Sequence, residues 1–173
     1  MNRFLGVDPG LRCTGYGAIE RTPEGARLLE AGIITPDAGA PLERRLGELH
    51  AELCAVLAAT RPDVMVIEEL WSGYKNPTTA VLMGHARGVL CLAAHDRGVP
   101  VRHLVHSHVK RVLTGSGAAR KDQVQRMVMQ QLGLETTPEP NDVSDALALA
   151  LALANIERTE LRFAALGIAL VAR

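Results

Sequence analysis

The stretch Gly6-Val7-Asp8-Pro9-Gly10 closes an apolar run that begins at Phe4 with a carboxylate and a Pro-Gly pair. Pro and Gly favour a turn, so the pattern predicts a short buried strand that stops at Asp8. A charge at the end of a buried strand is costly unless it is solvated, paired or bound to a metal. The stretch alone leaves two interpretations open: a turn-forming Asp, or a metal ligand.

Hydrophobic periodicity predicts the elements around this stretch. The expected order is strands at 3–8, 13–21 and 28–35, a helix at 41–60, a strand at 63–68, a helix from Thr78 to about His95 capped by Thr78 or Thr79, a strand at 101–105, helices at 107–113 and 121–132, and a final helix containing 146–154. Alternating Ala and Leu in 146–154 has period two, but both residues favour a helix. The order predicts an α/β fold: a mixed five-stranded sheet, with an antiparallel meander plus parallel strands, flanked by helices.

Length and composition indicate one domain with its own core. The chain has 173 residues, 47% of them hydrophobic, which is enough for a single domain at 1–158. Residues 159–173 form a C-terminal tail that is either docked or disordered. No signal peptide or membrane-spanning run is recognisable. Three widely spaced cysteines argue against a disulfide framework, and a cytoplasmic location is expected.

The formal net charge is zero, but the charges are unevenly distributed. The window 71–126 holds nine Lys or Arg against two acids, a net of +7, which leaves −7 for the remainder. A basic face of this kind attracts a polyanion such as DNA. The alternative is that these charges are scattered and solvated.

Four carboxylates are expected to meet at one edge of the sheet. Asp8 and Glu68 each end an apolar strand, and Asp142 and Asp145 are spaced to share one face of a helix. The last pair also suits a helix N-terminus, where acids favour the dipole. Four acids together would repel one another without cations, and hard oxygen ligands suit Mg²⁺ or Mn²⁺. Two such ions about 3.5–4 Å apart support phosphodiester hydrolysis.

The segment after Glu68 contains two of the five aromatic residues of the chain, Trp71 and Tyr74, followed by Lys75. Exposed rings stack on unpaired bases, and the polar neighbours favour exposure. The alternative is that Trp71 packs against the helix that begins near Thr78.

Several motifs together resemble the RuvC family of bacterial Holliday-junction resolvases over nearly the whole chain. They are Gly6-Val7-Asp8-Pro9-Gly10, Thr14-Gly15-Tyr16-Gly17, Ile67-Glu68, Ala86-Arg87-Gly88 and Asp142-Val143-Ser144-Asp145-Ala146-Leu147-Ala148. The resemblance implies a ribonuclease-H-like fold and a metal-dependent endonuclease that nicks four-way DNA junctions in pairs.

The resemblance also assigns roles to individual residues. It implies that Asp8, Glu68, Asp142 and Asp145 are the catalytic, metal-binding acids and that Lys110 and Lys121 support catalysis and DNA binding. It places an aromatic residue, here Trp71, at the junction centre. The expected DNA-binding residues are Trp71, Tyr74, Lys75, Arg87, Lys110, Arg111, Arg120 and Lys121.

The family further implies a homodimer that works with the RuvA–RuvB branch-migration complex in DNA recombination and repair. Two nicks on a two-fold symmetric junction need two sites, which a C₂ dimer supplies. Small residues on the 78–95 helix allow close approach to a partner or equally to the sheet of the same chain.

Other functions fit the residues less well. A P-loop is excluded because Gly115–Lys121 lacks the required Gly and hydroxyl, and His103, His106 and His108 have no zinc-site spacing. Two rivals remain: a ribonuclease-H-type nuclease for RNA/DNA hybrid or linear nucleic acid, and a junction-binding protein that does not cut.

Overall fold

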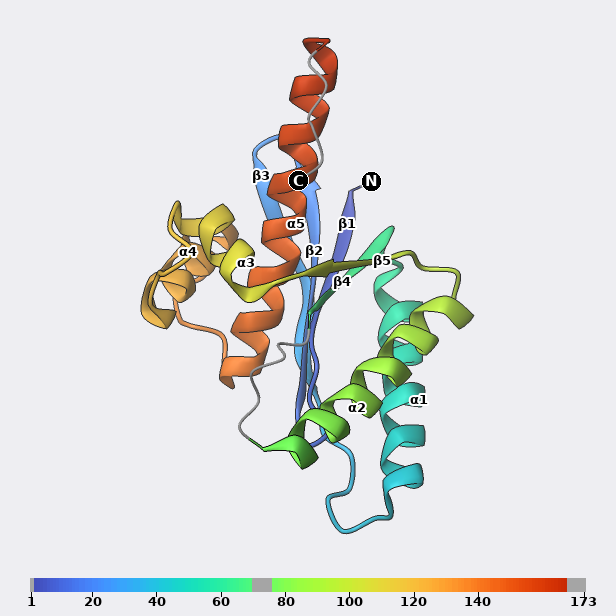
Figure 1. Cartoon of the computed structure of the whole chain (residues 1–173). Helices are drawn as coiled ribbons and strands as arrows, with labels where there is room; N and C mark the ends of the chain where they lie inside the picture. The colour runs from blue at the N-terminus through green and yellow to red at the C-terminus, as the bar shows by residue number, and fades with distance from the viewer. Residues whose placement is uncertain (1, 70–75, 168–173) are drawn as a thin grey trace.

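A five-stranded mixed sheet forms the centre of the protein (Figure 1). The computed structural model describes residues 2–69 and 76–167. The strand order is β3-β2-β1-β4-β5, with β1 antiparallel to β2 and parallel to β4. The strands are β1 (Arg3–Asp8), β2 (Thr14–Thr22), β3 (Gly25–Ile34), β4 (Val64–Glu68) and β5 (Val101–Leu104). The helices are α1 (Leu42–Thr60), α2 (Pro77–Asp96), α3 (His106–Thr114), α4 (Lys121–Leu132) and α5 (Asn141–Ala165).

Helices cover both faces of the sheet, with α1 and α2 on one face and α3, α4 and α5 on the other (Figure 1). Successive side chains of a strand point to opposite faces. In β1, Phe4 accordingly packs in the core with α5, whereas Leu5 and Val7 pack with α1 and α2. All three are fully buried, so β1 is apolar on both faces until it reaches Asp8.

Glycines let α5 approach the sheet closely. A Cβ added at Gly6 would collide with the main-chain oxygen of Ala146, and one added at Gly15 with the main-chain oxygen of Asp142. The first turns of α5 therefore lie directly on the backbones of β1 and β2. This close contact sets the height of the N-terminus of α5 above the strand ends.

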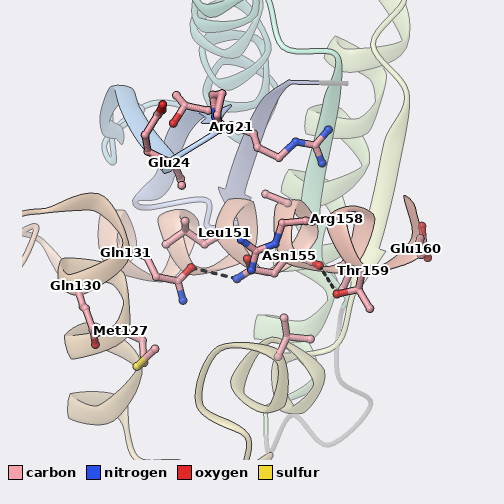
Figure 2. A pocket seen from close by; sticks show the side chains of 17 residues that line it. Arg21, Glu24, Met127, Gln130, Gln131, Leu151, Asn155, Arg158, Thr159 and Glu160 are labelled. Carbon is pink, nitrogen blue, oxygen red and sulfur yellow. Dashed lines mark hydrogen bonds between the residues drawn. The ribbon is translucent and has the colours of Figure 1, made fainter. Parts of the chain in front are cut away.

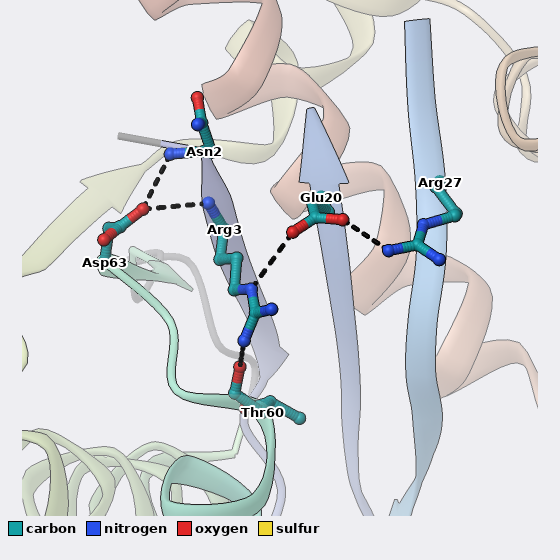
Figure 3. A network of polar contacts seen from close by, with 6 residues as sticks. All are labelled: Asn2, Arg3, Glu20, Arg27, Thr60 and Asp63. Atoms are coloured by element: carbon teal, nitrogen blue, oxygen red, sulfur yellow. Dashed lines mark hydrogen bonds and ion pairs between the residues drawn. The ribbon is translucent and has the colours of Figure 1, made fainter. Parts of the chain in front are cut away.

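The opposite end of the same strands carries a polar network (Figure 3). Arg3 Nε lies 3.2 Å from Glu20 Oε1, and Arg27 Nη2 lies 2.5 Å from Glu20 Oε2. The Asp63 carboxylate accepts hydrogen bonds from the backbone N–H groups of Asn2 (2.6 Å) and Arg3 (3.0 Å). Opposite charges alternate at this end, so no carboxylate in the network is left without a donor.

The expected fold class and element order are confirmed, and the differences are local. β3 begins at Gly25 rather than Leu28, because Thr22 pairs with Gly25 across a tight hairpin. The predicted cap of α2, Thr78 or Thr79, was wrong. The N-cap residue is Asn76, whose side chain accepts a hydrogen bond from the Thr78 N–H at 2.9 Å, and Pro77 occupies the first turn of the helix.

The Ala-Leu segment forms the centre of α5, which is longer than 146–154. Every residue from Ala146 to Ala154 is buried, so no amphipathic period is needed. Residues 159–165 continue the helix. Within the described ranges, no helix is long and apolar enough to cross a membrane.

Candidate active site

Two of the predicted acids stand at the ends of adjacent parallel strands. β1 ends at Asp8 and β4 ends at Glu68, and the residues before them, Val7 and Ile67, are partners across the two strands. The turn after Asp8 is held by Thr14, which is buried: its hydroxyl donates to the Gly10 carbonyl at 2.6 Å and accepts from the Gly10 N–H at 3.1 Å.

The other two acids come from the first turns of α5. Asp142 and Asp145 are both partly buried, and they reach the sheet edge because α5 sits on Gly6 and Gly15. Together with Asp8 and Glu68 they form what we call the carboxylate cluster.

The pKa of Asp8 reflects its burial and the charges of the other three acids of the carboxylate cluster. Burial, together with repulsion from Glu68, Asp145 and Asp142, raises the pKa of Asp8 from its ordinary value of 3.8 to about 7, and Lys121 opposes the change. A carboxyl group that resists ionisation among other acids favours a cation beside it. The four hard oxygen donors suit Mg²⁺ or Mn²⁺.

Two members of the carboxylate cluster are paired with basic side chains. Lys121 Nζ lies 2.8 Å from Asp145 Oδ2, and His106 Nδ1 lies 3.1 Å from Glu68 Oε1. The Glu68 carboxylate in turn raises the pKa of His106 above 6.5. In residues 2–69 and 76–167, no three His, Cys, Asp or Glu side chains are close enough together to hold a metal ion.

The predicted basic residues lie at different distances from this centre. Lys121 begins α4 and contacts Asp145, and Lys110 of α3 lines a small cavity together with Glu68 and Asp145. Arg111 is exposed on α3, and Arg120 is exposed and paired with Asp122 at 3.2 Å.

Arg87 has an internal role that the sequence did not indicate. Its Nε donates to the Glu68 carbonyl at 3.0 Å, and its Nη2 lies 2.6 Å from His103 Nδ1. It therefore ties α2 to the ends of β4 and β5. Trp71, Tyr74 and Lys75 lie outside the described residues, so their expected roles stay predictions.

Sequence reasoning missed His106, which was considered only as a zinc ligand. A signal was available: His106 follows β5, whose carboxyl end lies at the same sheet edge as those of β1 and β4. Polar residues just beyond parallel strands are candidates for such sites.

A separate cavity lies away from the carboxylate cluster (Figure 2). It has a volume of about 850 Å³ and is bounded by the β2–β3 hairpin, α4 and the middle of α5. Asn155 donates to Gln131 there at 3.1 Å. None of the carboxylate cluster lines this cavity, so size alone does not locate the chemistry.

A β3-β2-β1-β4-β5 sheet with acids at the ends of β1 and β4 and on the helix lying across them defines a ribonuclease-H-like nuclease. The family model described as "Crossover junction endodeoxyribonuclease RuvC" matches residues 4–153. The protein of that name from Rhodopirellula baltica is 51% identical over 150 residues, which cover 86% of this chain and 83% of the relative. The chain belongs to the RuvC family.

Solved structures agree. Thermus thermophilus RuvC matches with a TM-score of 0.85 at 35% identity, covering 91% of this chain and 96% of that one. The T. thermophilus protein in complex with Holliday junction substrate matches with a TM-score of 0.87 at 34% identity, covering 92% and 97%.

Proposed function

We propose that this chain is an endodeoxyribonuclease that resolves four-way (Holliday) DNA junctions by paired, metal-dependent nicks during recombination and repair. The observation that carries the proposal is the convergence of four carboxylates on Asp8 in a member of the RuvC family. A match to a junction-bound RuvC structure supports the same substrate.

Asp8, Glu68, Asp142 and Asp145 would hold the metal, and all four are catalytic in this sense. The pKa of Asp8 near 7 supports this role, since a cation there would offset both burial and repulsion. Two Mg²⁺ or Mn²⁺ ions, when bound, would supply an activated water and charge stabilisation at the leaving oxygen. The donor set suits either ion.

The basic residues nearest the cluster act on the phosphate. Lys121 reaches into the cluster, as its 2.8 Å contact with Asp145 indicates, and can stabilise negative charge that develops on the phosphodiester. Lys110, on α3 beside the same acids, would hold the backbone of the cleaved strand. Arg111 and Arg120, both exposed, would extend this basic surface.

The junction centre is proposed to be engaged by Trp71, with Tyr74 and Lys75 beside it. Stacking of a ring on an unpaired base contributes about 1–3 kcal/mol. Arg87 belongs to this DNA-binding set as predicted from sequence, but its contacts with Glu68 and His103 favour a structural part instead.

We also propose a homodimer, because two nicks need two sites. Val81 (59% exposed) and Leu92 (51% exposed) lie on the outer face of α2, with the exposed His85 and Gly88 at helical spacing between them. This α2 stripe is suited to self-association. The predicted partner that delivers junctions is the RuvA–RuvB complex.

Two further proposals are carried over from the sequence. The nuclease domain is residues 1–158, and the protein works in the cytoplasm. The three cysteines, which are all free, support a reducing compartment.

The deciding experiment compares cleavage of a mobile four-way junction, linear duplex and RNA/DNA hybrid, with Mg²⁺ or Mn²⁺ and with EDTA. Paired nicks confined to the junction are expected, and Asp8→Asn should bind the junction without cutting it. Comparable cutting of hybrid or duplex would favour a general ribonuclease-H-type nuclease. Tight binding without cutting in either metal would favour a junction-binding protein.

A further inference from the structure

Glu68 is held at two separate points. Its main chain is fixed by Arg87, whose Nε donates to the Glu68 carbonyl at 3.0 Å. The next residue, Glu69, donates its N–H to the Leu104 carbonyl of β5 at 2.9 Å. Its side chain is contacted separately by His106, through Nδ1 and Oε1 at 3.1 Å. The backbone contacts place the residue, whereas the His106 contact acts on its carboxylate.

The position of His106 is set by its neighbours rather than by its own burial. Leu104, the last residue of β5, and Val109, in the first turns of α3, are both buried and anchor the connection on either side. His106 is the first residue of α3 and is exposed. The imidazole therefore sits at the carboxylate without filling a core position, so its replacement should leave the fold intact.

The contact is suited to orienting a metal ligand. His106 Nδ1 and Glu68 Oε1 lie at an ion-pair distance of 3.1 Å, and because a carboxylate oxygen can only accept, a hydrogen shared by the two atoms would come from Nδ1. Glu68, His106, Lys110 and Asp145 also line a cavity of about 20 Å³, which is room for one water-sized group.

We propose that His106 is a positioning residue for Glu68: it donates from Nδ1 to Oε1 and so orients the carboxylate for a divalent cation. This inference rests on the proposed metal site. Hydrogen bonds to metal-ligating groups typically contribute about 10- to 100-fold to metal affinity. His106 is thus expected to act through Glu68, without touching the DNA or the metal.

The test is a calorimetric titration of the full-length protein with Mn²⁺ in the absence of DNA. His106→Ala should weaken binding by about 10- to 100-fold. His106→Asn should restore most of the affinity, because its amide N–H occupies the place of Nδ1–H, whereas the longer amide of His106→Gln should not. His108→Ala is the matched control, an exposed histidine on the same helix, and should bind Mn²⁺ like the wild type.

The outcomes separate this inference from the proposed function. If Glu68→Gln abolishes Mn²⁺ binding while His106→Ala binds as tightly as the wild type, the metal site stands and the positioning role is overturned. If His106→Asn is as weak as His106→Ala, donation from Nδ1 is overturned. If neither the wild type nor Glu68→Gln binds Mn²⁺, the proposed metal site itself fails. The unfolding midpoint of each variant checks that the fold is retained.

Discussion

The two ends of the central strands are built on opposite electrostatic principles. At the start of β1, Glu20 is paired with Arg3 and Arg27, and Asp63 accepts two backbone N–H groups. At the end of β1, Asp8 faces three other carboxylates, and its pKa rises to about 7. The same short strand thus begins beside carboxylates that are paired with donors and ends beside carboxylates that repel one another.

The difference indicates which end of β1 contributes to stability and which end is suited to function. The polar network at the strand starts lowers the pKa of Asp63, so the ionised acid favours folding. Burial and repulsion within the carboxylate cluster raise the pKa of Asp8, so the ionised acid opposes folding in the absence of a cation. Residues whose pKa is shifted in this unfavourable direction are candidates for a role in function rather than in stability.

The largest expected effect concerns Asp8 and pH. Its folded pKa, about 7, lies above the ordinary 3.8, so the folded state binds the extra proton and stability falls as the pH rises between these values. At most about 4 kcal/mol is involved. In EDTA, Asp8→Asn should therefore gain stability over the wild type from pH 4 to pH 7, measured by urea unfolding. If the free energy of unfolding of the two proteins changed with pH in the same way, the raised pKa of Asp8 would be contradicted.

A second prediction tests how α5 brings its acids to the cluster. Gly6→Ala should lower the free energy of unfolding by about 3 kcal/mol, the upper end of overpacking costs, because the new Cβ meets the Ala146 backbone. Gly47→Ala, on α1 with nothing near its Cβ, is the control and should stabilise the protein by about 0.5–1 kcal/mol. Equal effects in chemical unfolding would mean that α5 tolerates a shift away from the sheet.

The smallest effect is expected at the other end of the strands. Asp63→Ala should cost less than about 1 kcal/mol, since the carboxylate is exposed and its two N–H partners can turn to water. The folded pKa of Asp63 lies below 3.8, so its contribution is present above that pH and is lost as the pH falls through the folded pKa. The difference in stability between variant and wild type, measured by thermal unfolding from pH 7 downwards, should thus shrink as the pH falls below 3.8. A loss that persists at low pH would point to packing instead of charge.

Much of the site could be predicted from local patterns. Asp8 and Glu68 end apolar runs, which is a signal of strand ends at one sheet edge, and Asp142 and Asp145 share a helix face. The Asn76 cap was missed because Asn, Thr78 and Thr79 are all competent caps within four residues, and only the backbone conformation selects among them. His106 was missed because its contact with Glu68 depends on two strands that are far apart in the sequence.

The sequence by itself determined the order of elements, the mixed sheet, the acids and the family, because periodicity, turn residues and motifs are local properties. Only the tertiary structure decided that glycines seat α5 on β1 and β2, that Arg87 faces inward, and that His106 meets Glu68. Contacts of this kind depend on the heights and angles at which elements pack, and these follow from side-chain volumes summed over the whole core.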